Sequence, residues 1–441
     1  MSSVSCMFMC VFGDKVSRIF NTKQQFVVFL LHFICIIVTL RKISKQYSNL
    51  NQKSMKKSVF LSLAAIVAGL CLTSCGSKTA GNAEGADSLT LSGLNPVDFA
   101  SDSTGLYVIS NKNGMEVCFT NFGGRIVSIM VPDKDGNMTD VCLGHDNIAD
   151  YEKFGAEGCN FGALIGRYGN RIAKGQFTLD GESYQLPINN GPNSLHGGGP
   201  IAFHNRIWEA EPINDSSIAF STTSADGEDG YPGNIKVTVT YVVTEDNGLQ
   251  ISYFATTDKA TVLNLTNHCY FNLSGDGSKD CLDEVLWLDA DQFTAVDADV
   301  AVTGEVLDVE GTPFDFRTPT AIGERIDDET SEQIVNGHGY DHNWILNTKG
   351  DITKPFATLY DPNSGIQMDM FTDQPGVQFY AGNFLDGSFV GKKGVKYPRR
   401  SAFCFETQHY PDSPNHPEWP TTTLRPGEEY TTTTLYKFST K

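Results

Sequence analysis

The chain has 441 residues, 40% of them hydrophobic and 11% aromatic, which is enough to bury a sizeable core and excludes a disordered composition. The formal net charge is −19, and residues 1–75 hold nine of the 33 Lys and Arg residues but only one of the 52 Asp and Glu residues. The 24 basic and 51 acidic residues that remain disfavour nucleic acid as a partner, because Lys and Arg drive binding to phosphate backbones.

A short basic segment at 55–57 precedes an apolar run, VFLSLAAIVAGLCL, at 59–72. The run is too short to favour a membrane span and ends in TSCG, so residues 55–75 resemble a bacterial lipoprotein signal peptide with its lipobox. This resemblance implies cleavage before Cys75 and lipidation of that cysteine. It also implies a place in the bacterial cell envelope, periplasmic or at the outer membrane, with the lipid as the only membrane contact. An ordinary transmembrane anchor with a chance cysteine is the alternative.

Two further segments flank this signal. A second apolar run at 26–40 precedes Met55, and two export-like segments in tandem make little sense. We therefore expect translation to start at Met55 and residues 1–54 to be a non-native extension. Residues 76–98 begin with the small, polar stretch GSKTAGNAEGAD and are predicted to be a flexible tether. No linker is evident further on, so residues 99–441 are predicted to form one domain.

The body of the chain shows the alternation that is typical of β-strands. In residues 235–244, IKVTVTYVVT, apolar and polar side chains alternate with period two after a Gly- and Pro-rich turn. Similar stretches recur and are separated by turns such as DKDG at 133–136 and RPG at 425–427. Residues 321–335 are predicted to make a short helical excursion. Many strands without intervening helices predict an all-β fold, an antiparallel sandwich or barrel.

The 11 cysteines include no CxxC pair and no regular framework. Six follow Cys75, and isolated cysteines in a domain this large are expected to be buried thiols rather than disulfide partners. The stretch HGYDH at 338–342 superficially suggests metal ligands, but the sequence has neither an HExxH motif nor a Cys/His cluster. No metal is therefore expected.

The stretch TVLNLTNHCYFNLSG at 261–275 is predicted to be a strand with one polar face. Successive side chains of a strand point to opposite faces, so the leucines, Cys269 and Phe271 would pack on the core. The other face would carry Val262 and an unusual row of polar side chains: Asn264, Thr266, His268, Tyr270 and Asn272. Such a row is what a strand that lines a polar cleft would present.

Four more stretches combine polar side chains with a strand or turn context. They are GALIGRYGNRIAKGQF at 162–177, NNGPNSLHGGG at 189–199, NGHGYDHNWIL at 336–346 and FCFETQHYPDSPNHPEWP at 403–420. In the last, Glu406 falls among apolar neighbours, where an ionisable group is costly unless it is paired or used. Each residue also has a purely structural interpretation: His268 as a structural histidine, Glu406 paired with Arg171, His196 as a turn residue, and Asp341 as a cap or an Asx-turn.

Taken together, these stretches resemble the aldose 1-epimerase, or galactose mutarotase, family. The matching motifs run in order to the C-terminus: IGR..NRI.KG.F (165–177), PNSLHGG (192–198), NLTNH.YFNL (264–273), GYDHN (339–343), QPGVQFY.GNFLDG (374–387), FC.ETQ (403–408) and LRPGEEY (424–430). The resemblance implies a large antiparallel β-sandwich with a sugar-binding cleft. It also implies interconversion of the α and β anomers of hexoses, typically galactose and glucose.

The resemblance further implies the roles of individual residues. Glu406 would be the general base and His268 the general acid. The substrate-binding residues would be Asn170, Arg171, His196, Asp341 and Gln378. Tyr270 shares the strand face of His268 and is expected to line the same site.

The chemistry of mutarotation is consistent with these roles. The reaction removes the proton of the anomeric hydroxyl and delivers a proton to the ring oxygen; the ring opens, rotates about C1–C2 and closes on the other face. A glutamate is ionised at neutral pH, and a histidine can readily donate a proton. One acid and one base suffice, so neither a cofactor nor a metal is needed. The expected partner is a monosaccharide, an aldohexose.

Two alternatives stay open at this point. An epimerase of another sugar or of a hexose phosphate would share the fold, but a phosphate pocket should add basic residues, and the motifs offer only Arg171 and Arg167. A non-catalytic, surface-tethered carbohydrate-binding protein would have no need of an acid and a base, so the presence of both His268 and Glu406 argues against it.

Mass spectrometry of the native protein tests the N-terminal predictions. We expect the mature chain to begin at a lipidated Cys75, because the apolar run before it has the form of a cleaved signal. No peptide from residues 1–54 should appear. Detection of such a peptide would contradict the assignment of Met55 as the start of translation.

Overall fold

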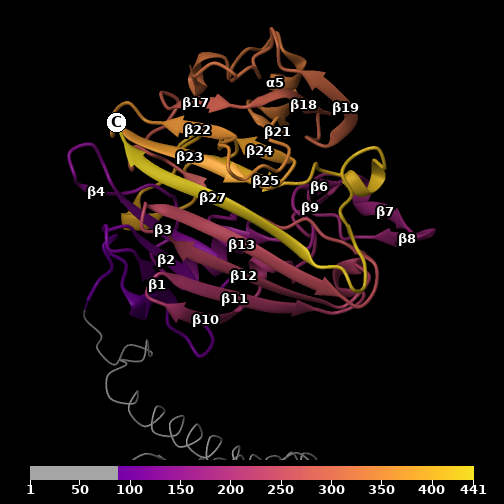
Figure 1. Ribbon diagram of the computed structural model, residues 1–441, viewed down its shortest axis with the longest axis horizontal. Helices are drawn as coiled ribbons and strands as arrows, with labels where there is room; N and C mark the ends of the chain where they lie inside the picture. Colours follow the sequence, from indigo (N-terminus) through magenta and orange to yellow (C-terminus); the bar gives the residue numbers. More distant parts are fainter. Residues whose placement is uncertain (1–87) are drawn as a thin grey trace, which may run out of the picture. The chain divides into compact units, whose positions relative to one another are not determined.

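The computed structural model describes residues 88–441, which form antiparallel sheets with few helices (Figure 1). The predictions for residues 1–54, for the signal peptide with Cys75, and for most of the tether lie outside the described residues. Between residues 88 and 441, no helix is both long and apolar enough to cross a membrane.

The largest sheet has nine strands, and the C-terminal strand lies at its centre (Figure 1). In spatial order its strands are β10 (Glu209–Asn214), β11 (Ser217–Ser224), β12 (Ile235–Val243), β13 (Gly248–Thr257), β27 (Tyr430–Thr440), β23 (Ile366–Thr372), β22 (Ala357–Tyr360), β17 (Val285–Leu288) and β20 (Thr320–Ala321). Buried side chains alternate along the whole of β12, so the strand predicted at 235–244 is confirmed.

A second sheet has six strands, and it has an apolar face and a polar face. Its strands, in spatial order, are β16 (Tyr270–Phe271), β25 (Phe403–Gln408), β24 (Gly376–Tyr380), β21 (Asp341–Leu346), β18 (Ala290–Val296) and β19 (Val302–Asp308). On β25, Phe403 and Phe405 belong to the main hydrophobic core. Because side chains alternate along a strand, Cys404 and Glu406 point away from that core.

The remaining strands form one four-stranded sheet and four pairs. The sheet is β1 (Leu106–Ser110), β2 (Glu116–Thr120), β3 (Arg125–Pro132) and β4 (Met138–Asp140). The pairs are β5 (Ala163–Ile165) with β15 (Thr266–His268), β14 (Thr261–Val262) with β26 (Thr423–Leu424), β6 (Arg171–Ile172) with β9 (Ser194–Leu195), and β7 (Gln176–Leu179) with β8 (Glu182–Gln185). Every named pairing in the described chain is antiparallel.

One hydrophobic core joins the three larger sheets. It contains Val237 from the nine-stranded sheet, Trp344 and Phe379 from the six-stranded sheet, and Ile129 from the four-stranded sheet, all with at most 1% of their surface exposed. A buried hydrogen bond reinforces this contact, since the hydroxyl of Tyr436 on β27 donates to the carbonyl of residue 405 on β25 at 2.9 Å. The predicted antiparallel β-sandwich is therefore confirmed.

The single strand predicted at 261–275 is wrong as a continuous element. The segment forms three short strands, β14, β15 and β16, and each pairs with a different partner: β26, β5 and β25. Because the partners belong to different sheets, the chain must change direction between them. The predicted apolar face is nevertheless confirmed, since Leu263, Leu265, Phe271 and Leu273 all lie in the main core.

The helices are short. The excursion predicted at 321–335 contains the 3₁₀ turn η5 (Ile322–Glu324) and the start of α5 (Glu332–Gly337) rather than one helix. The other helix, α4 (Ile148–Ala156), escaped prediction because two turns give too few apolar repeats, although Asn147 caps it by accepting from the N–H of Asp150. Single 3₁₀ turns complete the structure: η1 (Pro96–Phe99), η2 (Ala173–Gly175), η3 (Phe203–Asn205), η4 (Glu228–Gly230), η6 (Lys392–Gly394) and η7 (Ser413–Asn415).

The six cysteines of the described chain are free thiols. They are Cys118, Cys142, Cys159, Cys269, Cys281 and Cys404, and every one of them is buried. The prediction of buried thiols in place of disulfides is confirmed for these six.

Phe379 on β24 should be a main support of the six-stranded sheet. It is fully buried, and its ring lies 5.0 Å from that of Phe405, 5.6 Å from Tyr340 and 5.9 Å from Trp344, measured between centroids. We expect Phe379→Ala to lower the free energy of unfolding by about 3–5 kcal/mol, because it leaves a cavity. Chemical denaturation measures this loss.

The control is Phe254→Ala on β13, a phenylalanine with 41% of its surface exposed. It should change the free energy of unfolding by no more than about 0.5 kcal/mol. Equal effects of the two substitutions would contradict the position assigned to Phe379.

Candidate active site

A cleft of about 430 Å³ opens where β6, β15, β21 and β25 converge, a volume within the usual range of small-molecule sites. Seven of the eight predicted site residues line it: Asn170, Arg171, His196, His268, Tyr270, Asp341 and Glu406. The eighth, Gln378, is not part of the lining. Its side-chain amide donates to Asp341 Oδ1 at 2.7 Å, so Gln378 positions Asp341, which does line the cleft.

Glu406 is a buried carboxylate with hydrogen-bonding capacity to spare. Strand β25 projects it away from the core, beside Gln378 of the neighbouring strand β24. Only 2% of its surface is exposed, and Oε2 has no partner among the described residues. Burial raises the pKa of Glu406 well above its usual value; the charge of Asp341 adds to this, and that of Arg171 opposes it. Glu406 is therefore a buried carboxylate with an unused acceptor oxygen, and it takes up a proton more readily than an ordinary glutamate.

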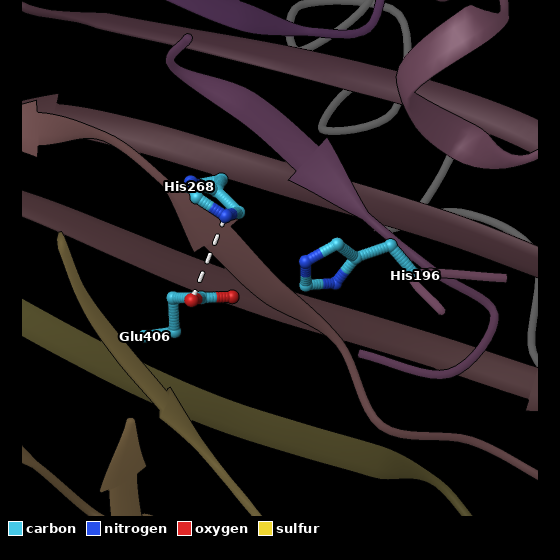
Figure 2. Close-up of side chains that lie close together, drawn as sticks. All are labelled: His196, His268 and Glu406. Carbon is cyan, nitrogen blue, oxygen red and sulfur yellow. Dashed lines mark ion pairs between the residues drawn. The ribbon is translucent and has the colours of Figure 1, made fainter. Parts of the chain in front are cut away.

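His268 lies against Glu406 (Figure 2). Its Nε2 is 3.6 Å from Glu406 Oε1, and its ring stacks on that of Tyr270 with the centroids 5.0 Å apart. Burial lowers the pKa of His268 to about 4. A proton donor and a proton acceptor therefore meet on one side of the cleft, although 138 positions separate them in the chain.

His196 and Asn170 hold each other in unusual backbone conformations. Both have left-handed backbones, with φ angles of 54° and 64°, and the N–H of His196 donates to the carbonyl of Asn170 at 3.1 Å. In return the N–H of Asn170 donates to His196 Nδ1 at 3.1 Å. Burial lowers the pKa of His196 well below its usual value, so the ring is neutral, and with Nδ1 accepting, its proton lies on Nε2.

This tautomer decides what His196 can do in the cleft. The ring faces the pair of His268 and Glu406 (Figure 2), and potential ligand atoms of the three residues lie within 4.8 Å of one another. Two histidines and a glutamate are a donor set that zinc accepts, but a metal would need the lone pair of His196 Nε2. Since the backbone N–H of Asn170 occupies Nδ1, the arrangement favours a hydrogen-bond donor over a metal ligand.

Arg171 and Asp341 form the opposite polar wall. Arg171 Nε donates to Asn190 Oδ1 at 2.9 Å, whereas its two terminal nitrogens have no hydrogen-bond partner within residues 88–441. Burial raises the pKa of Asp341, and the nearby charge of Arg171 acts in the opposite direction. Within the described chain, Glu406 makes its ion pair with His268 and none with Arg171, so the alternative that it merely pairs with that arginine is wrong.

The polar face predicted around His268 serves two purposes. His268 and Tyr270 line the cleft, as expected. Asn264 instead bonds the backbone of residue 409 in both directions, at 3.1 and 3.0 Å, and Asn272 donates to the carbonyl of residue 401 at 2.7 Å. The prediction that the whole face forms the floor is therefore wrong. The two asparagines secure the chain at both ends of β25, which carries Glu406.

Sequence reasoning missed much of the rest of the lining. The loop after α4 contributes Cys159, Asn160 and Phe161, and the segment after β24 contributes Phe384, which remains 53% exposed. Tyr380 and Phe384 lie within the motif QPGVQFY.GNFLDG, so alternation along β24 could have indicated Tyr380. No local signal marks the loop after α4, because only the tertiary fold brings it to the cleft.

Comparison with known proteins identifies the family of this chain. The family model for aldose 1-epimerase matches residues 105–437. Galactose mutarotase from Bos taurus is 45% identical over 327 residues, covering 74% of this chain and 91% of its own, and aldose 1-epimerase from Escherichia coli K12 is 39% identical over 336 residues, covering 76% and 94%. The solved GalM/aldose epimerase homologue from C. elegans superposes with a TM-score of 0.70 at 34% identity, covering 76% of this chain and 99% of that one. The chain therefore belongs to the aldose 1-epimerase family.

Proposed function

We propose that this protein is an aldose 1-epimerase, an isomerase that interconverts the α and β anomers of aldohexoses such as galactose and glucose, with His268 and Glu406 as the acid and the base. The observation that carries the proposal is the 3.6 Å approach of His268 Nε2 to Glu406 Oε1 in a cleft that holds a small molecule. This chain matches nearly the whole length of relatives that are named galactose mutarotase and aldose 1-epimerase.

The walls of the cleft suit a polyhydroxylated ring. A hexose that leaves water must have its hydroxyl hydrogen bonds replaced, because a buried unsatisfied polar group is costly. Arg171 offers its terminal N–H groups, Asp341 offers a carboxylate, and His196 offers Nε2–H. Tyr270 and Phe384 give apolar ring surface for the C–H faces of the sugar. Donors and acceptors thus surround the bound ring.

The reaction needs two proton transfers at neighbouring oxygens. Glu406 takes the proton of the anomeric hydroxyl while His268 donates from Nε2 to the ring oxygen, and the C1–O5 bond breaks to give the open aldehyde. Rotation about C1–C2 presents the other face of the carbonyl. On closure O5 attacks C1, His268 recovers a proton from O5, and Glu406 returns one to the new hydroxyl. His196 and Arg171 stabilise the charge that develops on oxygen.

The shifted pKa values of the pair suit this cycle. Ring opening converts an ion pair, carboxylate and imidazolium, into a neutral pair, carboxylic acid and imidazole. In water the ordinary pKa values of about 4.3 and 6.5 favour the ion pair by about 3 kcal/mol. Burial raises the pKa of Glu406 well above its usual value and lowers that of His268 to about 4, which removes this preference for the ion pair, while the charge of Arg171 opposes the rise for Glu406. Neither the ion pair nor the neutral pair is then so stable that it stops the cycle.

The alternative of a hexose phosphate epimerase finds little support. Arg167 takes no part in the cleft, because its guanidinium is used by Ser224 and by the carbonyls of residues 225, 232 and 233. Arg171 is then the only arginine or lysine in the lining, and the lining also includes Glu157 and Asp299. With Asp341 and Glu406, a dianionic phosphate would meet four carboxylates and one arginine, so the site favours a neutral sugar.

We also propose that the enzyme works in the bacterial cell envelope, held there by a lipid on Cys75. The support is the sequence alone: a basic start, a short apolar run and the tetrapeptide TSCG at 73–76. The tether that follows would let the domain reach sugars near the membrane surface.

Removal of either member of the pair should abolish most of the activity. We expect Glu406→Gln and His268→Asn each to reduce kcat by about 10²–10⁴-fold, since one positioned acid or base contributes that much. Polarimetry with freshly dissolved α-D-galactose or α-D-glucose measures the rate.

The matched control for Glu406→Gln is Glu284→Gln. Glu284 is another fully buried glutamate, but it accepts a hydrogen bond from the N–H of Leu273 and does not line the cleft. Its substitution should leave kcat near the wild-type value. A wild-type protein that binds sugar without accelerating the optical change would instead support the non-catalytic binder.

The pH dependence of the rate should be bell-shaped, because the pair is active with one proton. As the pH falls through the pKa of His268, about 4, the pair takes up a second proton and Glu406 can no longer act as a base. As the pH rises above the raised pKa of Glu406, the pair loses its last proton and no acid remains. Initial polarimetric rates, corrected for the buffer reaction, test this; a rate that keeps rising toward acid would contradict it.

A further inference from the structure

We propose that Cys404 is a positioning residue for His268: its sulfur accepts from Nδ1–H of the imidazole and so holds that proton on Nδ1, which leaves Nε2, the nitrogen that faces Glu406, free to give up a proton and take it back. The Sγ–Nδ1 distance is 3.4 Å. The inference rests on the proposed role of His268 as the general acid. It concerns the back of the imidazole, away from the sugar, since Cys404 does not line the cleft.

The geometry places the two partners of His268 on one strand. Cys404 and Glu406 lie two residues apart on β25 and share its face, so one contacts Nδ1 and the other approaches Nε2. Strand β25 also pairs Cys404 with Tyr270 of β16, whose ring stacks on the imidazole. Within the described chain, Cys404 Sγ has no other hydrogen-bond partner, and the imidazole also interacts with the backbone of His268 itself, which opposes the lowering of its pKa by burial. The ring is thus held on both edges and one face.

The thiol can serve both protonation states of His268. Burial, together with the charges of Glu406 and Asp341, raises the pKa of the Cys404 thiol well above its usual value, so the group stays S–H. Its sulfur accepts weakly from Nδ1–H, which is present both in the imidazolium and in the neutral imidazole that remains once Nε2 has given its proton to O5. A carboxylate at this position would only accept, and its charge would stabilise the imidazolium and weaken it as an acid.

Other groups around His268 do not occupy Nδ1. The ring of His196 lies edge-on at 5.1 Å between centroids, and that of Tyr380 lies edge-on at 6.3 Å. The titratable and charged groups that face or influence the imidazole are Glu406 on β25, Tyr270 on β16, Tyr380 on β24, His196 after β9, His204 on η3 and Arg125 on β3. Cys404 is therefore the group through which the tautomer can be tested.

The test compares the Cys404→Ala and Cys404→Ser variants of the full chain. Alanine removes the partner, so we expect kcat to fall by roughly 3- to 10-fold, the worth of one modest hydrogen bond, with KM unchanged. Serine also donates and accepts, so it should keep kcat within about 2-fold of wild type. The acidic limb of the pH profile should move to lower pH in the alanine variant, because the imidazolium loses its Nδ1 acceptor, and should stay in place in the serine variant.

Nitrogen-15 NMR of His268 gives a readout that does not depend on turnover. We expect the neutral ring to carry its proton on Nδ1 in the wild type and in Cys404→Ser, and to show a mixture with the Nε2–H form in Cys404→Ala. The controls are Cys281→Ala and Cys281→Ser, at a buried cysteine whose Sγ contacts the carbonyl of residue 400 at 3.4 Å, outside the cleft. Neither control should alter the kcat, the pH profile or the tautomer.

Three results would overturn the proposal: wild-type kcat and pH profile in Cys404→Ala, equal losses in the alanine and serine variants with an unchanged profile, or a wild-type spectrum with the proton on Nε2. If the alanine variant does not fold, the wild-type and serine spectra decide. A wild-type protein without mutarotase activity would refute the proposed function, while the tautomer measurement would still stand on its own.

Discussion

The register of β25 is the constraint on which the site depends. Because its side chains alternate, Phe403 and Phe405 enter the core, while Glu406 faces the cleft and Cys404 contacts His268 behind it; a slip of one residue would exchange the two sets. Contacts with the nine-stranded sheet fix this register, since the hydroxyls of Thr407 and Thr434 lie 2.6 Å apart. The packing of two sheets thus determines which way the carboxylate points.

Burial then gives this carboxylate its chemical character. When an exposed glutamate and histidine share one proton, the proton resides on the histidine, and moving it to the glutamate costs about 3 kcal/mol. In the cleft, desolvation disfavours the charged form of each group, as the raised pKa of Glu406 and the lowered pKa of His268 record. The same core packing that stabilises the fold therefore tunes the pair for reversible proton transfer.

The sequence predicted features that depend on local pattern, and missed those that depend on long-range packing. Alternation in residues 235–244 was sufficient to locate β12, and the ordered motifs located seven of the eight lining residues that were expected. The breaks within residues 261–275 could not be anticipated, because the partners β5, β25 and β26 come from distant parts of the chain. A motif alone could not show that the side-chain amide of Gln378 donates to Asp341.

The two arginines of the motif GRYGNR show where functional capacity lies in this fold. Arg167 and Arg171 are both almost fully buried, with 3% and 6% of their surface exposed, so burial does not distinguish them. Arg167 makes hydrogen bonds through all three of its guanidinium nitrogens, which leaves it a structural role. Arg171 uses only Nε within the described chain. Oε2 of Glu406 and the terminal nitrogens of Arg171 are left unsatisfied at the same cleft, and the hydroxyl groups of a hexose can satisfy both. Other buried polar atoms of the described chain also lack a partner, Glu284 Oε2 among them, so what marks the site is the convergence of unused acceptors and donors on one cleft.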